Sequence, residues 1–176
     1  SLYLTKDIKK YKVKIAENKI KRINNNTKIK TYKIRLNSKN LKKIIVNYDY
    51  IVDGSDNFKT KFLLNDFCFK FKKTLITGAI SKFDGHIFTF NFKNKDIPCL
   101  RCFFQESKIS ENLLNCESEG ILGTVAGIVG SIQANEVLKN ILNIGKGLDG
   151  YIFILDMLNL NFRKVKLKKR KNCFCK

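Results

Sequence analysis

The stretch that decides the fold is YDYIVDGSDNFKTKF, Tyr48 to Phe62. Up to Asp53 it predicts a buried strand, and after Ser55 it predicts the start of a helix. In a parallel α/β sheet, ligands bind beyond the carboxyl ends of the strands, and Asp56 lies at such an end. Its carboxylate suits Mg²⁺, which takes oxygen ligands, whereas the alternative is that Asp56 caps the following helix.

Helix and strand signals alternate along the chain on both sides of this stretch. Strands are predicted at TYKIRL (31–36), TLITGAI (74–80), HIFTFNF (86–92, antiparallel to a neighbour) and, as a pair or one long strand, YIFILDMLNLNFRKVKL (151–167). Helices are predicted within residues 10–26, after a Ser38 cap, around Phe58–Phe67 and over 120–142. We therefore expect an α/β fold, a Rossmann-like mixed sheet with flanking helices and helical crossovers.

The chain of 176 residues carries a formal net charge of +20. Such a charge would suit nucleic acid, but the lysines are spread along the whole chain, so we do not expect a nucleic-acid partner. The longest apolar run, Ile121 to Ile132, is well short of the roughly 20 residues of a membrane span. With no apolar run in Ser1 to Tyr11 either, neither a signal peptide nor a membrane partner is expected.

Four of the six cysteines form two close pairs, Cys99 with Cys102 and Cys173 with Cys175. Two distant pairs are the usual form of a structural zinc site with four thiolates, although the second pair is C-x-C, one residue shorter than usual. The alternative is a set of free thiols.

Three further residues could carry chemistry by themselves. Cys68 is predicted to be a buried core cysteine and His86 to be structural. Cys116 precedes a helix, whose dipole favours the thiolate, but Glu117 and Glu119 oppose it, so a catalytic role stays open.

Taken together, the motifs resemble those of the HesA/MoeB/ThiF adenylyltransferases, relatives of the ubiquitin-activating enzymes. They occur in the family's order over essentially the whole chain: DIKKYKVKIAENKIKRIN, YDYIVDGSDNF, TGAI, PCLRC, NCESEGILGTVAGIVGSIQANEVLK and the terminal cysteine pair. The resemblance implies one partial adenylation domain over residues 1–176, with a crossover loop region at 99–119 and a basic tail at 164–176 that carries zinc cysteines.

The resemblance also implies an activity. Such enzymes use ATP and Mg²⁺ to join AMP to the C-terminal Gly-Gly carboxylate of a ubiquitin-like sulfur carrier, in molybdopterin or thiamine biosynthesis or tRNA thiolation. The implied partners are that carrier, a separate sulfur donor, and a second copy of the chain or a complementing N-terminal half. The implied compartment is the cytoplasm or a plastid-type organelle.

Residue by residue, Asp56 matches the family's Mg²⁺ and nucleotide aspartate, Asn57 its nucleotide-contacting neighbour, and Lys12 the lysine that reaches the ATP phosphates. Cys116 matches a cysteine that in some members links covalently to the carrier. The structural zinc ligands are matched by Cys99, Cys102, Cys173 and Cys175.

Two departures from the family pattern are expected to matter. We expect no Gly-x-Gly-x-x-Gly phosphate turn in this chain, which suggests a truncated or split enzyme; the alternative is a non-catalytic docking subunit or pseudo-enzyme. Lys9 stands where the family usually has glycine.

Overall fold

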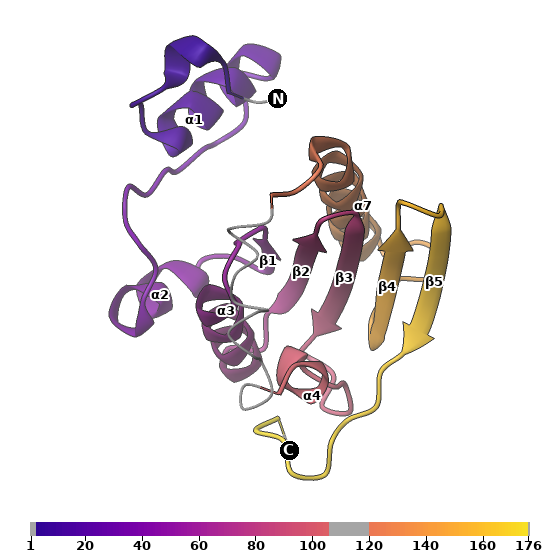
Figure 1. Ribbon diagram of the computed structural model, residues 1–176. Coiled ribbons are helices and arrows are strands. Elements are labelled where there is room, and N and C mark those ends of the chain that lie inside the picture. Colours follow the sequence, from indigo (N-terminus) through magenta and orange to yellow (C-terminus); the bar gives the residue numbers. More distant parts are fainter. Residues whose placement is uncertain (1–2, 106–119, 176) are drawn as a thin grey trace. The chain divides into compact units, whose positions relative to one another are not determined.

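The computed structural model describes residues 3–105 and 120–175 (Figure 1). The chain divides into two compact units, Ser1–Leu36 and Asn37–Lys176. The first unit holds a short 3₁₀ helix, Thr5–Asp7, and helix α1, Lys12–Ile23. Glu17 joins successive turns of α1, because its carboxylate accepts from Lys14 at 2.7 Å and Lys21 at 3.0 Å. These hydrogen bonds lower the pKa of Glu17 to about 2.

The segment TYKIRL forms no strand, so that prediction is wrong. A strand needs a neighbour for its backbone N–H and C=O groups. The strands of the described sheet all lie between Tyr50 and Lys166, and none of them pairs with residues 31–36. The alternation of apolar residues in this segment therefore does not mark a sheet.

The second unit is a five-stranded sheet with helices. Its elements are α2 (Ser38–Ile45), β1 (Tyr50–Asp53), α3 (Phe58–Lys70), β2 (Thr74–Ser81), β3 (Asp84–Asn91), α4 (Leu100–Phe103), α7 (Gly123–Leu142), β4 (Tyr151–Asp156) and β5 (Asn161–Lys166). The strands lie in sequence order. The expected mixed α/β sheet with flanking helices is confirmed.

The direction of the strands corrects one detail of that expectation. Only β1 and β2 are parallel, joined by the crossover helix α3, and every later neighbour is antiparallel. β2 and β3 form a hairpin, as do β4 and β5, which leaves no room for helical crossovers there. A second detail concerns α2, whose N-cap is Asn37 rather than Ser38, since the Asn37 side chain accepts from the N–H groups of Lys39 and Asn40.

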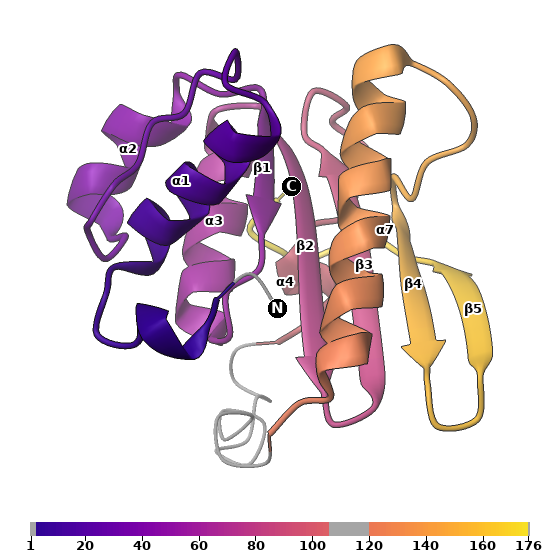
Figure 2. The same cartoon turned by 90° about the horizontal axis from the view of Figure 1, so that it is seen from above.

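The sheet is covered on both faces (Figure 2). Successive side chains of a strand point to opposite faces, so neighbours on β3 pack into different cores. Ile87 packs towards α7, in a cluster with Val125, Val129, Leu148 and Leu155. Phe88 lies on the other face, where its ring contacts those of Phe103 and Phe104, at and just after the end of α4.

Two glycines let α7 approach the sheet closely. A Cβ atom on Gly78 would lie 2.9 Å from Val129 Cγ1 and 2.9 Å from Gln133 Oε1, and one on Gly85 would lie 2.7 Å from Val129 Cγ2. Real Cβ contacts are longer than this, so glycine is required at both positions for α7 to pack where it does.

Within the described part of the chain, no helix combines the length and the apolar character that crossing a membrane requires.

The contact between α7 and β2 gives a first prediction. Gly78→Ala should lower the free energy of unfolding by about 1–3 kcal/mol, because the new methyl group overpacks against Val129 and Gln133. Gly127→Ala is the matched control: Gly127 lies in α7 with open space around it, so alanine there should raise stability by about 0.5–1 kcal/mol. Urea unfolding of the two variants measures both changes. Equal changes in the free energy of unfolding for the two variants would contradict the close approach of α7 to β2.

Candidate active site and metal centre

β1 ends at Asp53, which pairs in the parallel register with Thr77 in the middle of β2. Asp53 is 2% exposed, and its carboxylate accepts three hydrogen bonds. The donors are Ser55 N at 2.8 Å, Thr77 Oγ1 at 2.6 Å and Lys61 Nζ at 3.1 Å. The hydrogen-bonding capacity of Asp53 is therefore used within the fold.

Asp56 is exposed in the turn between β1 and α3. Its neighbour Asn57 is the N-cap of α3, because the Asn57 side chain accepts from Thr60 N at 2.9 Å. Asn57 Nδ2 also donates to Asp56 Oδ1 at 3.1 Å. The alternative in which Asp56 caps α3 is thus wrong, and its carboxylate lies at the surface beyond the end of β1.

Two adjoining cavities share this turn, since Ser55 and Asp56 line both. The first is lined mostly by apolar groups, among them Phe58 and Phe104, and the second reaches α7 at Gln133. Concave sites with a few converging polar groups are where proteins usually bind small ligands. The turn at which the sequence predicts a ligand borders two cavities, and its role in binding stays a prediction.

His86, interpreted from the sequence as structural, lines the same cavity as Asp56. Burial lowers its pKa, with Asp84 opposing the shift, so the imidazole is neutral at pH 7. The signal that could have located it is the alternation along β3, which puts His86 on the face of Phe88, towards α4. Sequence reasoning missed this placement because it treated the residue alone.

Lys12 and Lys9 belong to the N-terminal unit. Lys12 is the first residue of α1 and is exposed. Its role towards phosphates stays a prediction. Lys9 has φ +66°, in the left-handed region that glycine adopts without strain. Lys9 thus adopts a backbone conformation that is unusual for a residue with a side chain.

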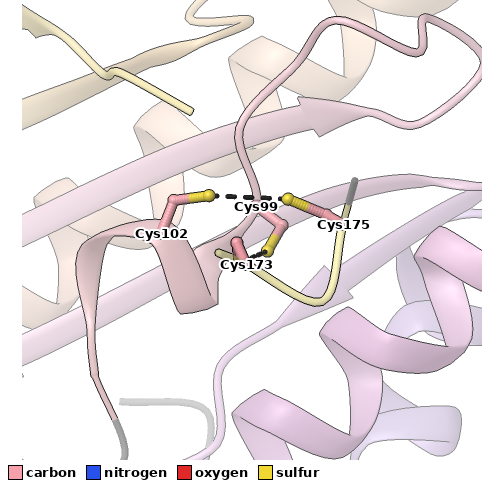
Figure 3. Close-up of side chains that lie close together, drawn as sticks. All are labelled: Cys99, Cys102, Cys173 and Cys175. Atoms are coloured by element: carbon pink, nitrogen blue, oxygen red, sulfur yellow. Dashed lines mark hydrogen bonds between the residues drawn. The ribbon is translucent and has the colours of Figure 1, made fainter. Parts of the chain in front are cut away.

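The four paired cysteines come together in space (Figure 3). Cys99 caps α4 and Cys102 lies within it, while Cys173 and Cys175 arrive from the C-terminal segment. All four Sγ atoms lie within 4.8 Å of one another. The pairing crosses between the two motifs, with Cys99 to Cys173 at 3.6 Å and Cys102 to Cys175 at 3.5 Å.

This cluster fits a tetrahedral zinc ion. Zn–S bonds of about 2.3 Å place thiolates roughly 3.8 Å apart, close to the two cross-pair distances. The short C-x-C spacing is no obstacle, because its two sulfurs face different partners. Burial would raise the pKa of Cys173, but hydrogen bonds from Cys175 N–H and the neighbouring thiols lower it to about 7. Cys68, by contrast, is fully buried in the core as predicted.

The expectation of no Gly-x-Gly-x-x-Gly spacing is wrong as a statement about sequence. Gly145, Gly147 and Gly150 have this spacing, but they connect α7 to β4, whereas a phosphate turn leads from a strand into a helix. The Glu136 carboxylate accepts from Leu148 N at 2.7 Å, so an acid already holds this loop. The segment is a fastened helix-to-strand turn and is unsuited to phosphate.

Cys116 and most of the predicted crossover loop lie outside the described residues.

Comparison with known proteins adds to this geometry. The ThiF family matches residues 1–176, the whole chain. The sulfur carrier protein adenylyltransferase of Thermus thermophilus is 35% identical over 98% of this chain, and the probable molybdopterin-synthase adenylyltransferase of Pyropia yezoensis is 40% identical over 94%. The chain spans 65% and 44% of the lengths of these two relatives.

A solved structure shares the fold. The crystal structure of E. coli MccB with ATP superposes with a TM-score of 0.80 over 99% of this chain and 53% of MccB. The sequence identity is 14%, so the likeness concerns the fold alone.

The cysteine cluster gives a prediction about metal. The purified protein should bind about one zinc ion per chain, and Cys175→Ser should weaken zinc affinity by roughly 100-fold or more, since it removes a ligand. Cys68→Ser is the matched control, because Cys68 is buried outside the cluster and should leave zinc affinity unchanged. Competition with a chromogenic chelator measures both affinities. Zinc well below half an equivalent in reduced protein would contradict the assignment.

Proposed function

The chain belongs to the ThiF family, and on that premise we propose that the protein adenylylates the C-terminal carboxylate of a ubiquitin-like sulfur carrier, with ATP as the donor of AMP. Relatives named as adenylyltransferases of a sulfur carrier and of molybdopterin synthase support the proposal. In the reaction, a carboxylate oxygen of the carrier attacks the α-phosphorus of ATP, and pyrophosphate leaves.

The observation that carries the proposal is the setting of Asp56. It is exposed at the carboxyl end of β1, it borders two cavities, and it is held beside the N-cap Asn57. Asp53, the last residue of β1, is buried, and its carboxylate accepts from three donors within the fold. Asp56 is therefore the aspartate of the two that is exposed at the cavities.

The chemical difficulty is electrostatic, because both reacting groups are anions. Mg²⁺ bound at this turn would supply charge that screens the carboxylate and phosphate from each other. Asp56 is the residue we assign to hold it, and the Asn57 side chain orients Asp56 through the bond to Oδ1. We assign Lys12 to the phosphates on the basis of the family resemblance.

The cysteine cluster has a structural part in this proposal. Cys102 lies in α4, and Phe104, which lines the first cavity, comes two residues later. A zinc ion held by the four thiolates would fix α4, and with it that wall of the cavity.

Charge suits the proposed partner. Residues 157–175 contain no acidic residue, and exposed basic side chains run through this segment: Arg163, Lys164, Lys166, Lys168 and Lys171. An acidic carrier would be drawn to such a surface from a distance.

The decisive test is ATP–pyrophosphate exchange with a carrier that ends in Gly-Gly. Asp56→Asn should lower the exchange rate by about 100-fold or more without changing thermal stability, because it removes the charge at the turn and keeps the shape. Asp96→Asn alters another exposed aspartate that lines neither cavity, so it should keep the full rate.

The assay is run with the chain alone and with the N-terminal part of the Thermus relative added. Exchange in either mixture that depends on Asp56 supports the proposal. Carrier binding by folded protein without exchange in both mixtures would reject the enzyme in favour of the docking subunit.

Salt tests the electrostatic part separately. The association rate of the carrier should fall by about tenfold between about 0.05 and about 0.5 M NaCl, since salt screens the basic segment. Stopped-flow fluorescence measures this rate. A rate that does not respond to salt would remove the steering argument and leave the adenylylation proposal intact.

A further inference from the structure

A buried lysine lies directly beneath the candidate site. Lys61 is on α3 and is only 5% exposed. Its ammonium donates to Asp53 Oδ2 at 3.1 Å and to the carbonyl oxygen of Gly78. The ammonium therefore ties α3 to the end of β1 and to the middle of β2.

The position is unfavourable for a cation in two ways. Lys61 is the fourth residue of α3, near the positive end of the helix dipole, and no acidic residue stands in the first turn. A buried ammonium also loses its hydration, which only a well-placed anion and further acceptors offset. A lysine in such a place indicates a specific requirement, because the helix dipole and burial both oppose it.

The ion pair of Lys61 and Asp53 fixes the backbone between the end of β1 and Asp56. Asp53 Oδ1 holds Ser55 N, and Gln133 of α7 donates to the Asp53 carbonyl oxygen at 2.9 Å from the other side of the sheet. Two residues further on, Asn57 is fixed as the N-cap of α3. Asp56 thus lies between two anchored points, and the first of them depends on Lys61 through Asp53.

The Ser55 hydroxyl points to a ligand independently. Ser55 Oγ is buried, lines both cavities, and has no hydrogen-bond partner among the described residues. Buried hydroxyl groups are nearly always satisfied, so an unsatisfied one at a cavity wall is accounted for when a bound molecule supplies the partner. The same anchored turn therefore presents a carboxylate and a hydroxyl together.

We propose that Lys61 is a positioning residue, which neutralises Asp53 and locks the turn so that Asp56 and Ser55 face the metal-bound nucleotide. The proposal deepens the proposed function and rests on it. Lys61 lines the first cavity, but its ammonium is taken up by Asp53 and the Gly78 carbonyl oxygen, so we assign it to the turn and not to the ligand. Of the two aspartates, Asp53 is buried and held by Lys61, whereas Asp56 is exposed and borders both cavities.

The test uses a double variant that removes the buried pair as a unit. Lys61→Met with Asp53→Asn leaves no unpaired buried charge, so the protein should still fold. The matched control is Lys139→Met with Glu136→Gln, which removes the α7 ion pair of 2.7 Å between side chains that are not among the described lining residues of either cavity. Lys61→Arg keeps the charge and serves as the conservative variant.

The first readout needs no activity. Amide hydrogen exchange of residues 53–58 should become about tenfold faster in the Lys61 double variant and stay unchanged in the α7 double variant. The single variant Lys61→Arg should keep the slow amide exchange of the unaltered protein. Unchanged protection of residues 53–58 in the Lys61 double variant would overturn the proposal.

The second readout separates positioning from loss of fold. The Mg²⁺ concentration for half-maximal pyrophosphate exchange should rise by about tenfold in the Lys61 double variant, as for changes behind a metal ligand, with the carrier KM unchanged. A purely structural role would lower the rate in proportion to the folded fraction and leave the Mg²⁺ dependence alone, which would also overturn the proposal. Absence of exchange in the unaltered protein would count against the proposed function, and the hydrogen-exchange result would still decide the part of Lys61.

Discussion

One buried carboxylate connects the parts of the sheet-bearing unit. Asp53 has to be satisfied away from water, and its partners come from α3 through Lys61, from β2 through Thr77, and from its own turn through Ser55. α7 joins at the Asp53 carbonyl through Gln133. Because a buried charge tolerates no missing partner, all these elements must arrive together, and the ligand-facing turn is fixed as a by-product of that requirement.

Local patterns predicted most of the fold, and non-local pairing caused the errors. The strand, turn and helix around Asp53, the antiparallel strand containing Phe88, and the two C-terminal strands follow from alternation and turn residues. TYKIRL has the same alternation but no neighbour in the sheet. The sequence of a short segment does not show whether such a neighbour exists. The direction of each later strand depends on the strand with which it pairs. The sequence of a single segment does not contain that partner.

The candidate site divides in the same way. Asp56 and the cysteine pairs were found because residue type and spacing are local, and the structure brings the four sulfurs together. Their chemical roles stay predictions. Lys61 could not be singled out, because nothing in the sequence separates it from the other 34 of the 35 Lys and Arg residues; only burial does. The glycine spacing at 145–150 is the opposite case, because the local pattern is present but the structure gives it no phosphate-binding context. This segment connects a helix to a strand, whereas a phosphate turn leads from a strand into a helix.

The crossed pairing of the cysteines has a consequence for the order in which the protein matures. Cys102 and Cys175 are 73 residues apart, so a metal that joins them closes a long loop. Restricting such a loop removes roughly 4 kcal/mol of chain entropy from the unfolded state. On the ribosome, this closure waits until residue 175 has emerged, after the whole sheet has been synthesised. Metal supply would then act on the yield of folded chains during synthesis, before any question of turnover arises.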